Sequence, residues 1–268
     1  MAWAVLAALG CWAPGARAGM IMIDDFTKPN PYQFFVVGSG MNPSKEITES
    51  SSGAIGGERD SLISVVGQAK PDSVVGIIGY DTYYTVNALQ VGTNGFAPTV
   101  AQLQYSGTDL LNTTTSLVNA HGLGGGLGID LTGGGTVDRF MLNFLSVDAQ
   151  PTTGLDVAVT ITSPGGKSSV GSIIVPNSMS ALTSYILFSN VHGTASTSHV
   201  DSITFTFNGK NETANVDYEV QMLAAVGTAI VPEPASGTLM MIAFGILAMT
   251  ACAARRRRQT KLMSALTS

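Results

Sequence analysis

The densest cluster of charged side chains in this 268-residue sequence is Glu58-Arg59-Asp60. The planar guanidinium of an arginine suits a bidentate carboxylate partner, so the cluster predicts a structural ion pair, with a ligand site as the alternative. Glu58 and Asp60 also have the residue types of a glycosidase pair. In one strand they would share a face about 6.5 Å apart, whereas such acids usually lie on separate strands across a cleft. The spacing therefore favours the ion pair.

Two adjacent acids near the start of the chain, Asp24 and Asp25, offer carboxylate oxygens to a calcium ion. Calcium takes about six to eight oxygen ligands, so other parts of the fold would have to contribute. The sequence has no spaced acidic loop of the EF-hand kind. We expect either a structural calcium site or a turn that one acid caps while the other is solvated. No other cofactor is expected.

Histidine is too rare and too scattered to predict a metal or catalytic site. The three histidines lack the i, i+4 spacing of a helical zinc pair, so loop positions at the surface are expected. No Gly-x-Ser-x-Gly element marks a serine nucleophile in the central part of the chain. The histidines are His121, His192 and His199.

Four tyrosines are candidates for an aromatic platform on which sugars stack. They are Tyr80, Tyr83, Tyr84 and Tyr105. A strand would send Tyr83 and Tyr84 to opposite faces, so at most one of that pair can face a ligand. Residues 19–231 contain no tryptophan, which weakens the sugar-binding interpretation. The residues of a glycan site stay unknown at this point.

The scaffold that would position these residues is predicted to be all-β. The central sequence is rich in Gly, Thr, Ser and Val. Apolar and polar residues alternate with period two over 156–162, 203–208 and 216–222, which is typical of half-buried antiparallel strands. Residues 140–144 are apolar on both faces, which indicates a central strand.

Short turn signals separate these segments, among them Pro164-Gly165-Gly166 and Asn208-Gly209. Many short strands at this spacing predict one domain over residues 19–228, an antiparallel two-sheet sandwich of jelly-roll type. The glycine-rich stretch 122–135 is predicted to hold a strand, 127–131, between two glycine turns. It does not have the Lys-Ser/Thr ending of a phosphate-binding loop.

The charge of residues 19–231 excludes some partners. Seven Lys and Arg face seventeen Asp and Glu there, a net charge of −10. Without a basic stripe, nucleic acid and anionic lipid are not expected as partners. Cys11 and Cys252 both lie outside this region, so it offers no disulfide and no thiol nucleophile.

Both ends of the chain have the features of targeting segments. Residues 1–18 predict a signal peptide, in which an apolar run precedes Ala16-Arg17-Ala18, a small-x-small cleavage site at Ala16 and Ala18. At the other end, residues 235–254 carry no charge. At about 1.5 Å per residue they nearly span a hydrocarbon core of roughly 30 Å, so we expect a single transmembrane helix. The arginines Arg255, Arg256, Arg257 and Arg258 predict a membrane stop, and 259–268 a cytoplasmic tail.

Pro232-Glu233-Pro234, the apolar run and the arginine cluster stand in an order that resembles the PEP-CTERM sorting signal of exported bacterial proteins. The resemblance implies recognition by an exosortase and cleavage near the Pro-Glu-Pro motif. It also implies a Gram-negative cell that makes exopolysaccharide. The precursor would be anchored in the inner membrane, and the product would reach the cell surface or the medium. The sorting signal is expected to occupy residues 229–258.

The central domain shows a second resemblance, to a recurring body of PEP-CTERM proteins. Its marks are Ile23-Asp24-Asp25-Phe26, Gly56-Gly57-Glu58-Arg59-Asp60, Leu103-Gln104-Tyr105-Ser106-Gly107 and Ile203-Thr204-Phe205-Thr206-Phe207. That body is similar to the jelly-roll domains of carbohydrate-binding modules, and the resemblance implies no specific activity. We expect a non-catalytic surface or extracellular-matrix protein associated with exopolysaccharide. The alternatives are a carbohydrate-binding module with a defined glycan site and a secreted hydrolase.

Overall fold

The computed structural model describes most of the central domain. The described residues are 19–26, 33–37, 40–41, 44–50, 53–66, 68–69, 74–78, 87–93, 98–107, 122–150, 152–210 and 216–228. Residues 18–228 form one compact unit. Within the described part of the chain no helix is long and apolar enough to cross a membrane. The predicted signal peptide and the predicted span 235–254 lie outside the described residues.

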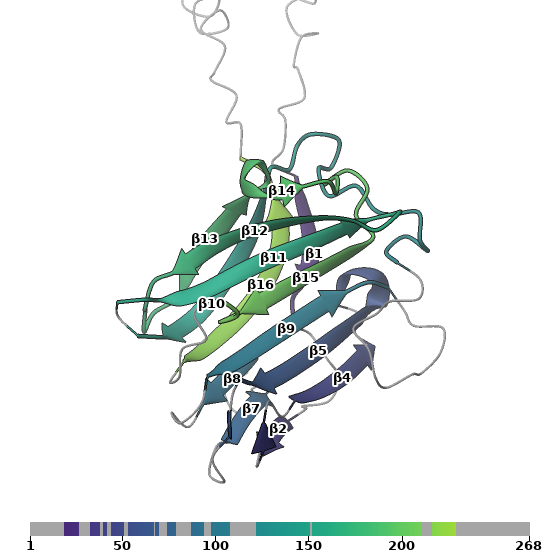
Figure 1. Cartoon of the computed structure of the whole chain (residues 1–268). Coiled ribbons are helices and arrows are strands. Elements are labelled where there is room, and N and C mark those ends of the chain that lie inside the picture. The colour runs from purple at the N-terminus through teal and green to yellow at the C-terminus, as the bar shows by residue number, and fades with distance from the viewer. Residues whose placement is uncertain are drawn as a thin grey trace, which may run out of the picture. The chain divides into compact units, whose positions relative to one another are not determined.

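Two antiparallel sheets make up the domain (Figure 1). The β10 sheet runs in the order β13 (Leu182–Leu187), β10 (Arg139–Asp148), β16 (Asp217–Val226), β8 (Leu89–Thr93), β7 (Val74–Ile78) and β2 (Gln33–Val37), with β1 (Met20–Asp24) also paired to β16. The β11 sheet runs in the order β14 (His192–Gly193), β12 (Lys167–Val175), β11 (Leu155–Ser163), β15 (Ser202–Phe207), β9 (Thr99–Tyr105), β5 (Glu58–Val65) and β4 (Ser44–Ser50).

A small two-stranded sheet and two 3-10 turns complete the described structure. Strands β3 (Gly40–Met41) and β6 (Gln68–Ala69) form a two-stranded sheet. Two 3-10 turns, η2 (Ile55–Gly57) and η3 (Phe188–Asn190), lie before β5 and after β13. The predicted all-β class with two antiparallel sheets is therefore confirmed, and the finer jelly-roll assignment stays a prediction.

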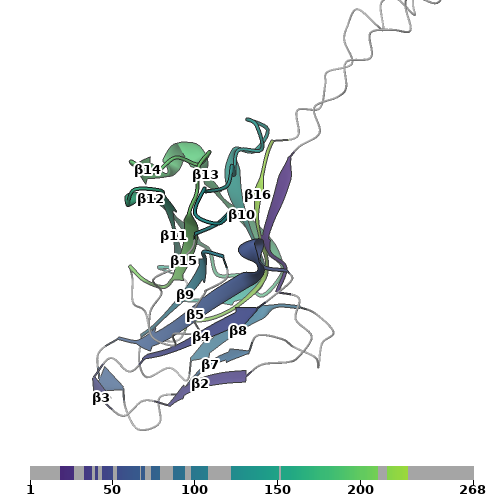
Figure 2. The ribbon, with the colours of Figure 1, turned by 90° about the vertical axis from the view of Figure 1, so that its right-hand side faces the viewer.

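The two sheets form layers that pack through their inward-facing side chains (Figure 2). Phe140 of β10 meets Phe205 of β15 edge to face at 5.9 Å between ring centroids. Farther along, Phe207 stacks on Tyr218 at 5.1 Å. Such aromatic pairs add about 0.5–1.5 kcal/mol beyond the area that they bury. The core of the sandwich is thus closed by contacts between strands that are distant in sequence.

The alternating segments of the sequence form strands where they were predicted. Val157, Val159 and Ile161 point into the core from β11 and are fully buried, whereas Ala158, Thr160 and Thr162 on the opposite face are half-buried. β15 and β16 show the same alternation. β10 lies between β13 and β16 and is therefore not an edge strand.

The predicted strand over residues 127–131 is wrong. The region consists of turns, and only Ile129 forms an isolated bridge, with Val200. Gly128, inside the predicted strand, has a φ of +75°, which an extended strand does not accommodate. The carboxylate of Asp130 then accepts hydrogen bonds from backbone amides two and four residues later, which forms a further turn. The glycine conformations and the hydrogen bonds to Asp130 therefore favour turns here, although the apolar residues alternate as they would in a strand.

Candidate functional site

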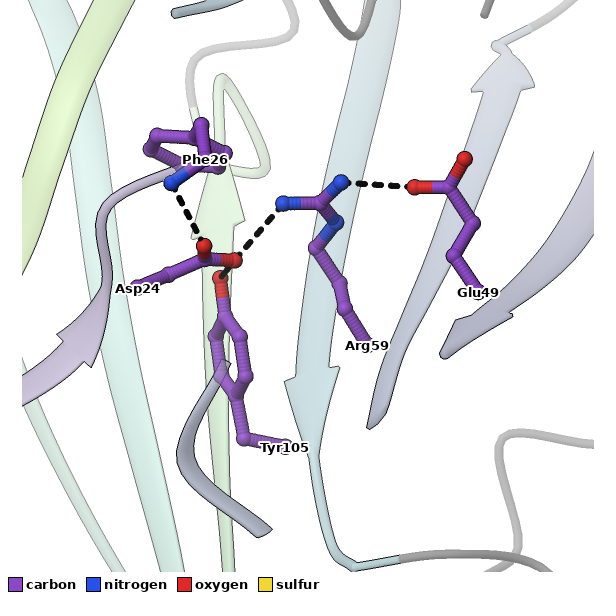
Figure 3. A network of polar contacts seen from close by, with 5 residues as sticks. All are labelled: Asp24, Phe26, Glu49, Arg59 and Tyr105. Atoms are coloured by element: carbon purple, nitrogen blue, oxygen red, sulfur yellow. Dashed lines mark hydrogen bonds and ion pairs between the residues drawn. The ribbon is translucent and has the colours of Figure 1, made fainter. Parts of the chain in front are cut away.

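The main cluster of ionisable groups is centred on Arg59, which points from β5 into the core (Figure 3). Its Nη1 donates to Asp24 Oδ2 at 2.7 Å, and its Nη2 donates to Glu49 Oε2 at 2.6 Å. Tyr105 from β9 donates its hydroxyl to the same Asp24 oxygen at 2.8 Å. Arg59 stands opposite Glu49 in the ladder between β5 and β4, so sheet register places the two charges together. Strands β1, β4, β5 and β9 thus meet at one polar cluster.

Asp24 is held in place by the end of β1. Its Oδ1 accepts the backbone amide of Phe26 at 2.7 Å, which forms a tight turn. Phe26 has a φ of +55°, an uncommon value for a residue with a bulky side chain. Its ring lies 5.1 Å from the guanidinium carbon of Arg59, a cation–π contact. The strained turn is therefore offset by contacts with the cluster that it helps to build.

Water is excluded from this cluster. Arg59 is 1% exposed, and Asp24 and Tyr105 are fully buried. Burial lowers the pKa of Arg59, but attraction to Asp24 and Glu49 outweighs it, so the net pKa lies above the ordinary value. Burial raises the pKa of Tyr105, and the negative charge of Asp24 raises it further, so the hydroxyl stays protonated as a donor.

The geometry of the cluster suits structure better than chemistry. A catalytic acid or nucleophile needs access to a substrate, and these groups are closed to solvent and bonded to one another. The guanidinium Nε of Arg59 is buried without an acceptor among the described residues. An unsatisfied buried donor costs about 1–3 kcal/mol, which offsets part of the stabilisation from the two ion pairs.

Glu58 and Asp60 are separated from Arg59 by the pleat of β5. Alternate residues of a strand point to opposite faces, so these two acids project outward while Arg59 points inward. Asp60 Oδ1 accepts the hydroxyl of Thr48 at 2.6 Å. Both acids are nevertheless buried, at 7% and 5% exposure. Arg59 does form a structural ion pair, as predicted, but with Asp24 and Glu49 from other strands.

The calcium prediction for Asp24 and Asp25 stays untested. In the structure the Asp24 carboxylate is neutralised by Arg59, while Asp25 is half-buried and has a polar partner. Among the described residues no three His, Cys, Asp or Glu side chains are grouped closely enough to hold a metal ion. The structure therefore brings a cation of the protein itself to Asp24.

The other predicted candidates are dispersed. His192 and His199 are exposed, and His199 Nδ1 lies 3.2 Å from the hydroxyl of Ser198. Tyr105 is fully buried in the polar cluster, so its proposed role in a sugar-stacking platform is wrong. The remaining candidates, His121, Tyr80, Tyr83 and Tyr84, lie outside the described residues.

Sequence reasoning missed a second arginine site, at the end of the domain where both termini emerge. Gly227 donates its amide to the carbonyl of Gly19 at 2.9 Å, just after the last residue of β16 and just before the first residue of β1. Beside it, Arg139 pairs with Asp138 at 2.6 Å. The hydroxyl of Thr228 donates to Asp138 at 2.8 Å and accepts a hydrogen bond from Arg139. The adjacency of an acid and an arginine at 138–139 was the available sequence signal.

A groove of about 490 Å³ lies over the outward face of the β11 sheet, the sheet toward the viewer in Figure 1. Its rim includes Val170 and Ile174, which are 47% and 53% exposed. At one end the carboxylate of Asp156 accepts the backbone amide of Lys210 at 2.8 Å. The groove is lined by Asp156, Ala158, Val170, Ser172, Ile173, Ile174, Thr206, Gly209 and Lys210.

The sequence beyond the described domain matches one family model. It is the model of the PEP-CTERM protein-sorting motif, and it covers residues 231–258. The chain carries a PEP-CTERM sorting motif. The match confirms the predicted signal, with Pro232-Glu233-Pro234 and Arg255 to Arg258 inside it. The motif indicates an exported protein that an exosortase processes. No curated protein matches the chain.

Several solved structures resemble the chain at low identity. A family 11 carbohydrate-binding module from Clostridium thermocellum, in complex with a β-1,3-1,4-mixed-linked tetrasaccharide, is 17% identical. Its TM-score is 0.38, over 78% of this chain and 96% of that chain. A mutant of a family 29 carbohydrate-binding module is 9% identical with a TM-score of 0.33, over 82% of this chain and 99% of that chain. Because both scores are low, the fold assignment rests on the strand pairing described above.

Proposed function

We propose that this chain is a non-catalytic protein of the cell surface or extracellular matrix, exported and processed by an exosortase, and associated with exopolysaccharide. The observation that carries the proposal is the PEP-CTERM motif at residues 231–258. The motif begins five residues after β16 ends at Val226. Cleavage near Pro232-Glu233-Pro234 would therefore release the β-sandwich without removing any of its strands.

The closed polar cluster supports the non-catalytic part of this proposal. Arg59 and its two carboxylate partners, the strongest candidates for chemistry in the sequence, form ion pairs with one another that join three strands. A domain that must persist outside the cell without a disulfide benefits from such a cross-link. We infer that the buried charged residues stabilise the domain, and that its surface contacts the exopolysaccharide.

The intact mass of the protein released from exosortase-containing cells tests the proposal. We expect a mass that corresponds to residues from about 19 to about 232. The double change Pro232→Ala and Pro234→Ala should keep the precursor in the membrane fraction. Pro176→Ala, which changes a proline of the β-sandwich domain outside the motif, is the matched control and should leave release unchanged. A released protein that still contains residues 235–258 would contradict processing.

The groove on the β11 sheet favours a second candidate function, that of a carbohydrate-binding module. Its volume lies within the roughly 300–1,000 Å³ of typical small-molecule sites, which are mostly apolar with a few placed polar groups. Val170 and Ile174 offer aliphatic surface to the C–H face of a sugar ring. Ser172, Thr206 and Lys210 offer hydrogen-bonding groups to its hydroxyls.

Local backbone structure keeps the groove open at its charged end. Asn208, with a φ of +59°, turns the chain, and its backbone amide donates to the carbonyl of Asp156 at 2.8 Å. A Cβ on Gly209 would lie 2.6 Å from a methyl group of Thr206, so a larger residue there would require the Thr206 side chain to shift. Because the body carries a net charge of −10, a neutral glycan fits the groove better than an acidic one.

Titration of the purified body with neutral and acidic polysaccharides tests the second candidate. We expect saturable binding to a neutral polymer and at least a tenfold loss in a Ser172→Leu variant, which removes a hydroxyl and fills part of the groove. Ser168→Leu is the matched control, since Ser168 is also exposed on β12 but does not line the groove. Equal loss in both variants, or binding of acidic polymers alone, would exclude this site.

A further inference from the structure

The folded domain holds both of its ends at one place. The backbone hydrogen bond from the Gly227 amide to the Gly19 carbonyl follows the β1–β16 ladder and joins the two terminal segments. Gly19 directly follows the predicted cleavage point at Ala18, and Val231, the first residue of the sorting motif, is only three residues beyond Thr228. Along the sequence, both predicted processing points therefore lie within a few residues of this hydrogen bond.

Three side chains fasten the outgoing chain at this end. Arg139 donates through Nε to Asp138 Oδ1 at 2.6 Å and through Nη2 to Oδ2 at 3.0 Å. Thr228 donates its hydroxyl to Asp138 Oδ2 at 2.8 Å, and Arg139 Nη2 also donates to the Thr228 hydroxyl. The ring of Tyr185 lies 5.6 Å from the guanidinium carbon of Arg139 and restrains it from β13. Each of the three hydrogen-bonded side chains bonds to the other two.

Close backbone packing supports the same end. A Cβ on Gly227 would lie 1.7 Å from the carbonyl oxygen of Thr136, and one on Gly19 would lie 2.4 Å from its hydroxyl. Two glycines thus allow both terminal segments to approach Thr136. The ends of a strand ordinarily open at little cost in free energy. Here side-chain bonds and tight packing oppose that opening.

We propose that Asp138, Arg139 and Thr228 form an exit clamp, which restricts the access of the processing enzyme to Pro232-Glu233-Pro234. This inference rests on the proposed processing by an exosortase. Four Cα–Cα steps join Thr228 to Pro232, and at about 3.3–3.6 Å each they reach at most about 14 Å. Each further residue that peels from the ladder lengthens this reach by about 3.5 Å. An intact clamp therefore limits the length of chain that separates the motif from the last fixed residue, Thr228.

The clamp is exposed enough that its effect on cleavage is modest. Asp138 and Arg139 have side-chain exposures of 51% and 25%, and exposed ion pairs stabilise a structure only slightly. We expect Thr228→Val and Arg139→Gln to speed cleavage roughly 1.5- to 5-fold, because an open exit becomes more populated. The threonine change removes the hydroxyl and keeps the branched shape.

Pulse-chase labelling of the full-length precursor, in cells that contain the exosortase, measures this rate. Thr183→Val, at an exposed position of β13, is the matched control and should cleave at the rate of the original protein. Insertion of Gly-Ser-Gly after Ala229 lengthens the chain between Thr228 and Pro232 and leaves the hydrogen bonds of the clamp in place. In that background Thr228→Val should give no further acceleration.

A second measurement does not depend on the enzyme. Hydrogen exchange at the Gly227 amide of the purified precursor should be faster in Thr228→Val than in the original protein, while β11 amides exchange alike. If the original precursor is never cleaved, the proposed function fails. If it is cleaved but the clamp variants, still folded, are processed no faster, the clamp inference is overturned and the proposed function stands.

Discussion

The domain contains two arginines, and each contacts carboxylates in a different environment. Arg59 is 1% exposed and joins Asp24 and Glu49 across three strands. Arg139 is 25% exposed and joins Asp138, its neighbour in sequence. The donor–acceptor distances are nearly the same, at 2.6–2.7 Å. The donor–acceptor distance therefore does not determine how much each ion pair contributes to stability. The access of water to the pair determines it.

The physical reason lies in what each arginine leaves behind when it is removed. Without Arg59, two buried carboxylates lose their counter-charge in a region that water does not enter. Without Arg139, Asp138 is more than half exposed and becomes solvated. Loss of one partner of a buried pair costs about 3–5 kcal/mol, whereas exposed pairs are worth about 0.2–1 kcal/mol.

The largest expected effect is that of Arg59→Met. It should lower the free energy of unfolding of the released domain by about 3–5 kcal/mol, since Asp24 and Glu49 would remain buried after losing the guanidinium charge. Urea denaturation followed by the near-ultraviolet circular dichroism of the tyrosines measures it. Arg139→Met is the matched control and should lose less than about 1 kcal/mol. Equal losses of unfolding free energy in the two variants would mean that burial does not distinguish the two arginine sites.

Tyr105→Phe should have an intermediate effect. The change removes one donor to Asp24 and leaves Arg59 in place, so we expect a loss of about 1–3 kcal/mol. The same urea experiment measures it, with Tyr185→Phe as the exposed control. A loss no larger than that of the control would mean that Arg59 alone satisfies Asp24.

The sequence predicts the fold better than it predicts these sites. Period-two alternation located β11, β15 and β16, because each buries one face against the opposite sheet. The run Glu58-Arg59-Asp60 drew attention to the right arginine, which shares a face with the core residue Ile63. Its partners could not be predicted, since Asp24 lies 35 residues away and meets Arg59 only through the register of the sheets. Strand pairing is a property of the whole domain.

Arg139→Gln should have a small effect that depends on salt. The Debye length falls from about 10 Å at 0.1 M ionic strength to about 3 Å at 1 M, so an exposed pair is screened. We expect the loss of about 0.2–1 kcal/mol at low salt to vanish near 1 M salt. Urea denaturation at both ionic strengths measures it. A loss that persists at high salt would point to packing on Tyr185 rather than to charge.

The smallest and most local effect concerns the titration of Asp138. The hydrogen bond from Arg139 lowers the pKa of Asp138 to about 2, with a further contribution from Thr228. Because the folded pKa lies below the ordinary value of about 3.9, this carboxylate stabilises the fold above about pH 3.9 and loses that contribution as the pH falls through about 2. Half-exposure limits the contribution to about 1 kcal/mol at most.

Carbon-13 NMR of the Asp138 carboxyl group measures this pKa directly. In Arg139→Gln we expect the midpoint to move up toward about 3.9, and in Thr228→Val to move by less, since Arg139 is the larger cause. An unchanged midpoint in Arg139→Gln would mean that hydroxyl and backbone donors hold the charge. Neutral hydrogen bonds, which salt does not screen, would then hold the chain at Thr228. The Arg139 site would still differ from the Arg59 site in burial, but it would no longer count as an ion pair that stabilises the fold.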